Sequence, residues 1–487
     1  MTNYETVIGL EIHAQLKTNS KLFCACPTVF GVEPNTQVCP VCLGMPGVLP
    51  VINEKAINYA VQMALALGCK INARSIFARK NYFYPDLPKG YQISQFDEPF
   101  SELGEIDIAT EGRGPRTIGV TRVHMEDDAG KLQHGEAVAT SLRLPEDADS
   151  SFVDLNRTGM PLIEIVSEPD MRSADEAVAY FKAIRDIILY LGICDGNMQE
   201  GSLRCDANVS IRPEGQEKLG TKAELKNMNS FKFIKDAINF EVARQRDLIE
   251  SGGAVLQETR LFDPASGVTR PMRTKEEAHD YRYFPEPDLL PLLIPDEMVE
   301  ELRAKLPELP QAKRARFIAE YKLPPYDAGV LTASKDLAAY FEDTVKLSDD
   351  AKTVSNWIMG ELLRLLKETS KDLSDSLVTP KKLAGLLTLV KEGKISNKIG
   401  KEVFEEIFTT GKEPSAIVEA KGISQISDTG ELEGIIDKII ADNQDSVERY
   451  RAGKTKLMGF FVGETMKATK GRANPGLVSK MLKEKLS

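Results

Sequence analysis

Strict alternation of apolar and polar side chains in residues 7–16 is the sequence feature that most constrains how this chain can fold. Side chains along a β-strand point alternately to the two faces of a sheet, so the apolar positions of this segment are expected to face a core. The opposite face then carries Glu11, His13 and Gln15. Because carboxylates and imidazoles bind metals and move protons, the polar face of this strand is a candidate functional surface.

Three further segments, residues 122–126, 203–212 and 222–226, repeat this alternation. Carboxylates with an imidazole bind a hard cation such as Mg²⁺, and Arg and Lys bind phosphate oxygens, so the combined set fits a metal–nucleotide site. The ordinary alternative is that each strand exposes a polar face to water. We interpret the four segments as one shared functional face. Its further members are Arg122, His124, Glu126, Arg204, Asp206, Asn208, Ser210, Arg212, Lys222, Glu224 and Lys226.

Four of the seven cysteines form two close pairs, Cys24 with Cys26 and Cys39 with Cys42. Two such pairs can surround one tetrahedral Zn²⁺, and the Pro and Gly residues around them suit the turns of a zinc knuckle. A reducing compartment disfavours disulfides, which leaves burial without a ligand as the alternative. We therefore predict a structural zinc whose shell is closed by four sulfur ligands.

Residues 79–95 combine aromatic, basic and proline residues and are predicted to form a loop. Aromatic rings interleaved with Lys and Arg can stack on bases and neutralise phosphates, which makes a nucleotide or the end of an RNA a candidate ligand. Packing of the rings over the core is an equally good explanation, because burial alone would account for residues 82–84.

Three segments have the apolar spacing of amphipathic helices: residues 53–67, 173–191 and 231–251. Apolar residues three and four positions apart place one continuous stripe on a helix, and that stripe packs against a core. The second helix begins with a capping-box sequence at Ser173, which predicts where it starts.

Strands are predicted for most of residues 102–211 outside the second helix, and residues 273–295 form a β-like tract rich in proline. Residues 159–169 predict a buried strand that carries a single acid, Glu164. A buried carboxylate is costly without a partner, so Glu164 is expected to meet a metal or an Arg.

Helical periodicity dominates after about residue 293, and residues 349–368 are the clearest single helix. The end of the chain differs in charge, because residues 449–487 hold ten Lys or Arg against two Glu. This local net charge of +8, in a chain of net charge −11, fits a nucleic-acid surface. A solvated helix surface would explain the charge as well.

The motif content excludes several common enzyme classes. The sequence has no phosphate loop of the P-loop type, no dinucleotide-binding glycine motif and no nucleophile elbow. It also has no Gly/Ser-rich amidase tract, so any ammonia that this chain used would have to come from another chain. No signal peptide or membrane-spanning stretch is present, and we therefore expect a cytoplasmic protein of about two to four domains.

Six motifs resemble one known family closely. They lie at residues 10–16, 39–50, 82–94, 200–209, 224–231 and 279–287. Together they resemble the B subunits of the bacterial aspartyl/glutamyl-tRNA amidotransferases. The helical remainder resembles the linker and tail of the same family, so the resemblance covers the whole chain.

The resemblance implies an α+β fold, in which a cradle of antiparallel strands related to glutamine synthetase and the guanido kinases is followed by an all-α domain and a helical tail. It places the cradle at residues 1–293, with the zinc knuckle at 24–42. The helical domain would occupy residues 294–406, and the basic, tRNA-binding tail would occupy residues 407–487.

The resemblance also implies a reaction. ATP, with Mg²⁺, would phosphorylate the side-chain carboxylate of Glu-tRNA(Gln) or Asp-tRNA(Asn), and ammonia would displace the phosphate. Such an enzyme is a ligase that forms a carbon–nitrogen bond with glutamine as amido donor. An amidase-like A subunit would supply the ammonia through an internal channel, and a small C subunit would complete the heterotrimer.

Family and chemistry together assign roles to particular residues. The catalytic and metal-binding residues would be Glu11, His13, Glu126, Asp206 and Glu224, with Glu11, His13 and Glu126 as Mg²⁺ ligands. Arg204, Lys222 and Lys226 would neutralise the transferred phosphate. Tyr82 and Lys89 would position the aminoacylated end, and Lys467, Lys470 and Arg472 would contact the tRNA.

Two other functions compete with this assignment. A non-catalytic, zinc-containing tRNA-binding subunit would explain the cysteines and the basic tail, but it would leave the polar strand faces without a role. A stand-alone ligase for a small amino acid would leave the tail without one.

Overall fold

The computed structural model describes residues 3–110, 113–134, 150–274, 278–422, 429–469, 473 and 475–486. The chain divides into two compact units, Met1–Leu309 and Pro310–Ser487. The expected domain boundaries at residues 293 and 406 stay predictions. No helix in the described part of the chain is long and apolar enough to cross a membrane.

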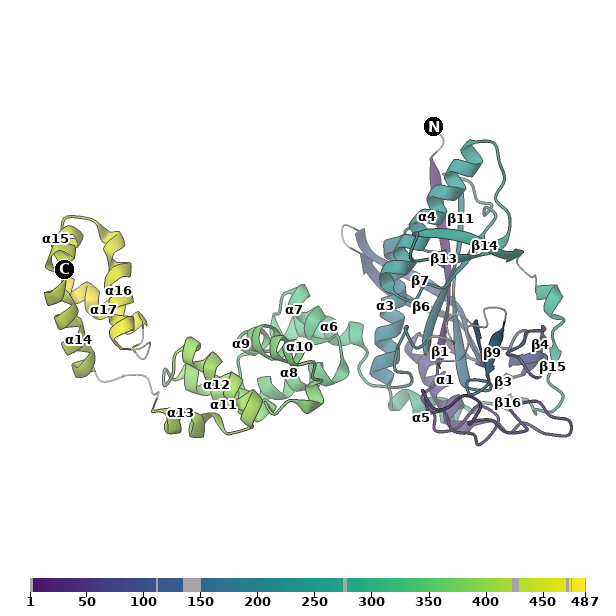
Figure 1. The fold of residues 1–487 in the computed structure, drawn as a ribbon, viewed down its shortest axis with the longest axis horizontal. Coiled ribbons are helices and arrows are strands. Elements are labelled where there is room, and N and C mark those ends of the chain that lie inside the picture. The colour runs from purple at the N-terminus through teal and green to yellow at the C-terminus, as the bar shows by residue number, and fades with distance from the viewer. Residues whose placement is uncertain are drawn as a thin grey trace. The chain divides into compact units, whose positions relative to one another are not determined.

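A nine-stranded sheet forms the centre of the first unit (Figure 1). Within the described residues its neighbours pair antiparallel except β12 and β13, so the predicted α+β class with an antiparallel sheet is confirmed. In spatial order the strands are β14 (Val268–Thr274), β13 (Glu258–Asp263), β12 (Ala223–Lys226), β11 (Leu203–Pro213), β1 (Tyr4–Gln15), β10 (Pro161–Ser167), β7 (Arg113–Asp127), β6 (Ser101–Thr110) and β2 (Lys70–Ile71).

Strand β1 lies in the middle of this sheet and has the two faces that its sequence predicts. Leu10, Ile12 and Ala14 are fully buried in the core of the unit, whereas Glu11 and His13 are only partly buried. Burial of a Leu or Ile side chain contributes roughly 1.5–3 kcal/mol, so this alternation fixes which face of β1 meets the core.

Helices pack on the apolar face of the sheet and form one core with it (Figure 1). The three predicted helices are present as α1 (Glu54–Ala66), α3 (Ala174–Leu191) and α4 (Phe231–Glu250), and the unit ends with α5 (Asp296–Ala304). Because these helices cover only the apolar face, the polar face of the sheet stays available for a site.

The start of α3 is only half of the predicted capping box. The Ser173 hydroxyl accepts a hydrogen bond from the Glu176 backbone N–H at 3.2 Å, as expected. The Glu176 carboxylate, however, accepts from the Arg172 N–H at 2.6 Å and faces Arg116, so it does not return to Ser173. An available guanidinium attracts this buried acid more strongly than the second capping bond would.

Residues 79–95 are not simply a loop, and this prediction was wrong in part. Their two ends form paired antiparallel strands, β4 (Ala78–Asn81) and β5 (Tyr91–Ser94), and β5 also packs against β7. The tract at 273–295 is β-like only in short pieces, the strands β15 (Phe284–Pro285) and β16 (Leu292–Leu293), and it also contains a 3₁₀ turn (Ala278–Tyr281).

The other small strands of the first unit are β3 (Arg74–Ser75), β8 (Lys131–His134) and β9 (Ser151–Asp154).

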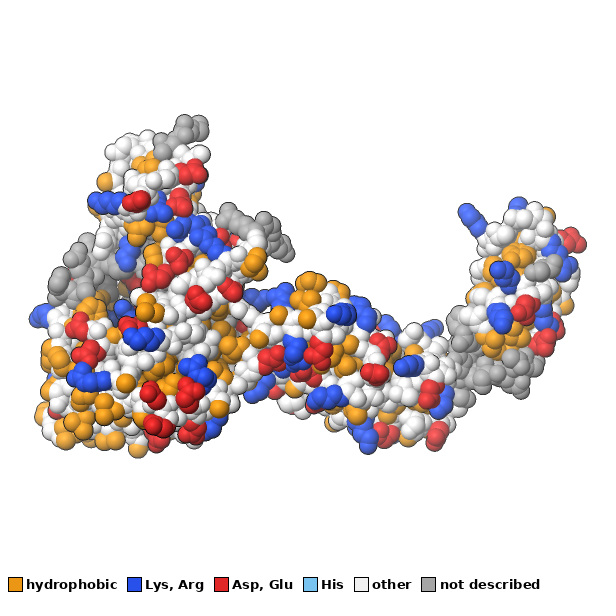
Figure 2. Space-filling view, turned by 180° about the vertical axis from the view of Figure 1, so that it is seen from behind, with side chains coloured by type: hydrophobic (Ala, Val, Ile, Leu, Met, Phe, Trp, Pro, Cys, Tyr) orange, Lys and Arg blue, Asp and Glu red, His pale blue; other side chains and the backbone are white. Residues whose placement is uncertain are grey.

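The second unit is helical in the residues described, as predicted, and contains two apolar clusters. Figure 2 shows charged side chains of both signs spread over the surface of its helices. Its helices are α6 (Pro310–Tyr321), α7 (Pro325–Leu331), α8 (Lys335–Ser348), α9 (Ala351–Trp357), α10 (Leu363–Thr369), α11 (Pro380–Lys391), α12 (Asn397–Thr410), α13 (Pro414–Lys421), α14 (Thr429–Asp442), α15 (Gln444–Arg451), α16 (Met458–Ala468) and α17 (Pro475–Leu486), with 3₁₀ turns at Leu373–Asp375 and Thr455–Leu457.

The helix predicted at residues 349–368 is interrupted by one π-helical turn, Ile358–Leu362, between α9 and α10. Both terminal residues of this wider turn are fully buried. Sequence spacing alone indicated one regular helix, because a single extra residue per turn leaves the apolar pattern almost unchanged.

A buried carboxylate fastens the outer strands of the sheet to α4. Glu241 is fully buried and accepts hydrogen bonds from Arg244 at 2.7 and 2.9 Å and from Thr269 of β14 at 3.0 Å. The Arg260 guanidinium of β13 lies 3.3 Å away. Strand β13 pairs with β12, so this network supports the edge of the polar face.

Substitution Glu241→Ala is expected to destabilise the first unit by about 3–5 kcal/mol, because it removes the buried carboxylate that Arg244, Arg260 and Thr269 all contact. Hydrogen exchange should rise in β13 and β14. The exposed Glu250→Ala on the same helix is the matched control and should change stability by under about 0.5 kcal/mol. The single tryptophan, Trp357, lies in the second unit. Its fluorescence therefore reports the unfolding of that unit and serves as an internal reference. Unchanged exchange in β13 would contradict the role of Glu241.

Candidate functional site

The register of four neighbouring strands brings polar residues into one row. His13 of β1 lies opposite Glu164 of β10 and, on the other side, opposite Arg204 of β11. Glu164 in turn lies opposite His124 of β7. Directly opposed residues point to the same face of a sheet, so these side chains form a row across the face that the helices leave uncovered.

Two imidazoles and two carboxylates meet in this row. His13 Nε2 lies 3.2 Å from Glu164 Oε2, and His124 Nε2 lies 3.6 Å from the same oxygen. One donor atom from each of His13, Glu126 and Glu164 lies within 4.8 Å of the others. Carboxylates with an imidazole are ligands of divalent cations, so these three residues could hold one metal ion.

A cavity of about 410 Å³ lies against this cluster, and a second of about 400 Å³ shares five of its lining residues. Of the residues predicted from sequence, the first cavity is lined by Glu11, His13, Tyr82, Arg122, His124, Glu126, Lys222, Glu224 and Lys226. The second adds Arg204 and Asp206. The structure therefore brings the four predicted strand faces together around one hollow surface.

Glu11 is near the three grouped donors but is not one of them. Its Oε1 accepts a hydrogen bond from the Asn208 side chain at 2.8 Å, and Glu11 lies two residues along β1 from His13. Of the three predicted Mg²⁺ ligands, the structure thus groups His13 and Glu126, and it supplies Glu164 beside them. The assignment of Glu11 to the metal stays a prediction.

The other two predicted acids, Glu224 in the first cavity and Asp206 in the second, both contact Lys226. Asp206 forms an ion pair with Lys226, and Lys226 Nζ also lies 3.4 Å from Glu224 Oε1. Glu224 accepts a hydrogen bond from Thr259 at 2.8 Å. One lysine between two acids is held in place, and its charge faces the cavity.

Strands β4 and β5 position Glu126. The carboxylate accepts a hydrogen bond from Gln92 at 2.8 Å and one from Ser94 at 2.7 Å, and Lys80 Nζ lies 4.0 Å away. The site predicted from sequence did not include Gln92, Ser94 or Lys80, and it did not place Glu164 in the cluster. The single acid in an apolar strand did signal Glu164, but no pattern in the sequence marked the partners of Glu126.

The two buried carboxylates of the cluster stay ionised because cationic groups lie beside them. Burial alone would raise the pKa of Glu164, but the imidazoles of His124 and His13 hold it well below its usual range. Burial also opposes ionisation of Glu126, and Lys80 lowers the pKa of that carboxyl in spite of it. Burial would lower the pKa of His13, and the hydrogen bond to Glu164 raises it above the ordinary value.

Arg204 is held by a buried carboxylate in the wall of the second cavity. Its guanidinium donates to Asp128 at 2.8 Å, and Asp128 also accepts from Gln15 at 2.7 Å and lies 3.5 Å from Arg157. Burial by itself would raise the pKa of Asp128, but the two guanidinium groups keep it below its ordinary value. This wall therefore presents a positive group with a fixed orientation.

The two residues predicted to hold the aminoacylated end lie apart. The Tyr82 hydroxyl donates to Gln92 at 3.2 Å, and its ring lines both cavities. Lys89 forms a nearly buried ion pair with Asp127 and lines instead a smaller cavity of about 180 Å³ beside the cysteines. Tyr82 is thus placed to touch a ligand of the main cavity, whereas the role predicted for Lys89 stays a prediction.

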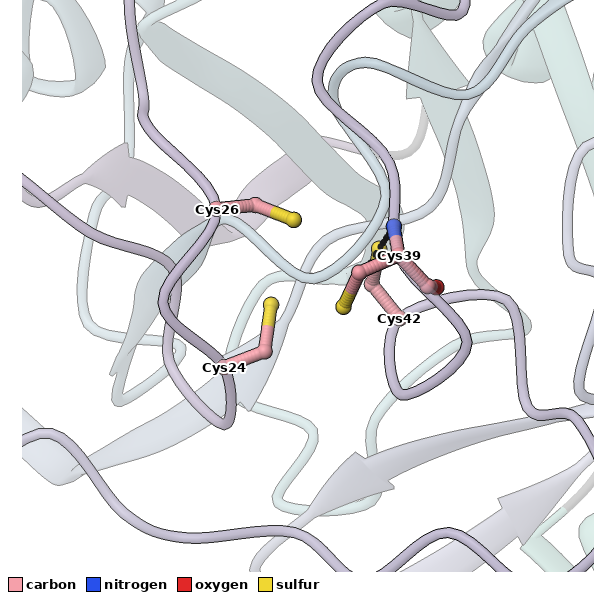
Figure 3. Close-up of side chains that lie close together, drawn as sticks. All are labelled: Cys24, Cys26, Cys39 and Cys42. Atoms are coloured by element: carbon pink, nitrogen blue, oxygen red, sulfur yellow. Dashed lines mark hydrogen bonds between the residues drawn. The ribbon is translucent and has the colours of Figure 1, made fainter.

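The four paired cysteines converge on one point (Figure 3). Their sulfur atoms all lie within 4.8 Å of one another, and the Cys39 backbone N–H donates to Cys42 Sγ at 3.2 Å. Hydrogen bonding from Cys24 holds the pKa of the Cys42 thiol below its ordinary value, which favours the thiolate form that metals bind. The cluster could hold a metal ion, as the spacing of the cysteines predicted.

Of the tail residues predicted to bind tRNA, only Lys467 lies within the described residues. Its side chain is 79% exposed and lies 3.9 Å from Glu464, so it is available to a partner molecule. Lys470 and Arg472 lie outside the described residues.

Comparison with known proteins gives a match along most of the chain. Residues 6–300 match the family described as GatB/GatE catalytic domain, and residues 339–486 match the family described as GatB domain. A protein of Geotalea uraniireducens is 59% identical over 484 residues, with 99% of each chain covered. One from Solidesulfovibrio magneticus is 57% identical over 486 residues, with 100% of each chain covered. Both are named as the B subunit of an aspartyl/glutamyl-tRNA(Asn/Gln) amidotransferase.

Substitution Glu164→Gln is expected to lower the pKa of His13, because burial then acts without the carboxylate that opposes it. In the wild-type protein the raised pKa means that the ion pair stabilises the fold below the unfolded-state pKa of His13. This contribution is lost as the pH rises through the folded-state value.

The measurement is an NMR titration of the imidazole signals with a chelator present. Glu102→Gln, which removes a carboxylate from the exposed pair with Lys70, is the control and should leave the His13 titration unchanged. A His13 pKa that stayed raised in Glu164→Gln would show that the Glu164 carboxylate does not set it.

Proposed function

This chain belongs to the GatB family of aspartyl/glutamyl-tRNA(Asn/Gln) amidotransferase B subunits, and on that basis we propose that it performs the ATP-dependent step of amide formation. In this step a side-chain carboxylate oxygen of Glu-tRNA(Gln) or Asp-tRNA(Asn) attacks the γ-phosphorus of ATP, and ADP leaves. Ammonia then attacks the acyl carbon and phosphate leaves, which gives Gln-tRNA(Gln) or Asn-tRNA(Asn). The enzyme is a ligase with glutamine as the source of ammonia.

The observation that carries this proposal is the cluster of His13, Glu126 and Glu164 at the wall of a cavity that several cations also line. A carboxylate is a poor electrophile, and its phosphorylation depends on positioned positive charge more than on a protein nucleophile. Several cationic side chains that line one cavity with grouped metal ligands are the arrangement that this chemistry needs. A subunit that only held tRNA would gain nothing from burying these charges.

Each part of the cavity has a task in the proposed step. His13, Glu126 and Glu164 would hold Mg²⁺, which neutralises phosphate oxygens and orients them for in-line transfer. Lys226 and Lys222 face the same space and would bind the transferred phosphate. Arg204, fixed by Asp128, would act from the second cavity, and Tyr82 lines both cavities, where the aminoacyl group must enter.

The strand cradle would be related in fold to glutamine synthetase and the guanido kinases, and Glu11, Asp206 and Glu224 would complete its acidic wall. We assign the ammonia to an amidase-like A subunit, with a small C subunit completing a cytoplasmic heterotrimer. The helical second unit would carry the tRNA, with Lys467, Lys470 and Arg472 on its contact surface.

We also propose that Cys24, Cys26, Cys39 and Cys42 hold a structural Zn²⁺. Four sulfur ligands grouped this closely are the donor set that zinc prefers in closed sites, and no ligand position is left for a substrate. The metal would tie the two cysteine turns together beside the cavity that Lys89 lines.

Substitution Glu126→Gln is expected to reduce ATP hydrolysis and amide formation by roughly 10²-fold or more. The reason is that a neutral amide no longer balances the charge of Lys80 or of the proposed Mg²⁺. The assay uses the chain assembled with its A and C subunits, with Mg²⁺ and Glu-tRNA(Gln). Glutaminase activity of the same complex should remain.

The matched control is Glu105→Gln, an exposed acid of β6 that does not line the cavities described. It should keep full activity. ATP hydrolysis that survived in Glu126→Gln would place the phosphorylation step on another chain and leave this one as a tRNA-holding subunit.

Substitution Cys39→Ser is expected to reduce the zinc content of the purified chain from about one equivalent to a small fraction, because hydroxyl oxygen is a poor zinc ligand. Metal content is measured by mass spectrometry of the digested protein. Cys205→Ala, a cysteine buried in β11, is the control and should leave the zinc content unchanged. Equal zinc contents in both variants would show that the four cysteines do not hold the metal.

A further inference from the structure

A fully buried lysine lies beside the cysteine cluster. Lys21 is 1% exposed, and its ammonium donates to the Gln37 backbone carbonyl at 2.7 Å and lies 3.7 Å from Cys42 Sγ. Among the described residues no carboxylate lies within ion-pair distance of it. An ammonium in such a place is rare, because buried lysines are almost always paired with an acid.

The cost of burying this charge requires an anion nearby. A carbonyl oxygen supplies a dipole but no counter-charge, and an unpaired buried ion is strongly destabilising. The sulfur of Cys42 is the one group in contact with Lys21 that can carry a negative charge in the described structure. Four thiolates around one divalent cation have a net charge of −2, so a cation in contact with the cluster is favourable.

Lys21 also joins the two cysteine turns to each other. Its backbone N–H donates to the Cys26 carbonyl at 3.0 Å, whereas its side chain reaches the turn that holds Gln37 and Cys42. Gly159 leaves room for this reach. A β-carbon there would lie 3.3 Å from Cys42 Cβ and 3.6 Å from Lys21 Cδ, at a φ of +81°. The lysine is thus built into the cluster from both sides.

We propose that Lys21 is a positioning residue of the cysteine metal site, and that its positive charge balances the thiolates and makes the bound metal harder to remove. This inference rests on the proposed function of the four cysteines as a zinc site. Its consequence is that metal retention depends on a side chain that is not a ligand, and that the cluster binds a thiolate-preferring cation such as Zn²⁺ most tightly with Lys21 in place.

A purely structural role for Lys21 predicts a different result. If the side chain only tied down the Gln37 carbonyl, its loss would destabilise the chain with or without metal. If it balances thiolate charge, its loss should weaken metal binding, and the metal-free chain should be no less stable, because a buried charge has been removed. Metal affinity and metal-free stability therefore separate the two roles.

The test compares the full-length chain with Lys21→Met and Lys21→Gln. The first removes the charge at similar length, and the second keeps a hydrogen-bond donor, so that one of them folds if the other does not. Lys17→Met, an exposed lysine on the same segment, is the control. Zinc affinity is measured by competition with a chromophoric chelator, and thermal unfolding is measured with zinc and with a chelator.

We expect Zn²⁺ affinity to fall about 10–100-fold in both Lys21 variants, with unchanged affinity in Lys17→Met and no loss of stability in the metal-free chain. Wild-type affinity in either folded Lys21 variant would overturn the inference and leave the zinc site intact. Absence of zinc from the wild-type chain would overturn both. A loss of stability with and without metal would show a structural tether instead.

A second measurement tests charge directly. Cys26→His replaces one thiolate with a neutral ligand while Lys21 keeps its contact with Cys42, so the cluster becomes less negative. The loss of affinity on Lys21→Met should then be smaller in the Cys26→His background than in the wild type. An equal loss in both backgrounds would overturn charge balance as the role of Lys21.

Discussion

The antiparallel register of β1 between β10 and β11 is the constraint on which the rest of the site depends. It sets His13 opposite both Glu164 and Arg204, and a slip of one residue would turn every polar side chain of β1 into the core. The apolar residues on the other face prevent that slip, because they are fully buried. The packing of the core therefore determines the geometry of the polar face.

Mutual neutralisation then makes this face possible. The buried groups of the cluster lie in a setting that disfavours charge, yet Glu164 and Glu126 stay ionised because imidazoles and Lys80 lie beside them. Such a cluster resists change in any one member, since removal of one charge leaves its partner buried and unpaired. It also offers bound phosphate and metal ions a preformed, charged and partly enclosed surface.

The cysteine turns adjoin this surface through one strand end. Asp127, which pairs with Lys89 in the cysteine-side cavity, follows Glu126 directly in β7. In β5, the Gln92 side chain donates a hydrogen bond to Glu126, and the Ile93 backbone N–H donates one to Asp127 at 2.7 Å. The proposed zinc knuckle thus lies beside the same strands that position the cluster.

The sequence by itself determined which residues face the core and which share the polar side, because strand alternation and helix spacing are local properties read directly from residue types. It also identified the four cysteines and indicated that Glu164 needs a partner. Only the tertiary structure decided that Glu164 lies with His13 and Glu126, that Lys80 and Gln92 contact Glu126, and that Lys21 lies against Cys42. These contacts join residues far apart in the chain, and strand order and register, which local patterns do not specify, place them together.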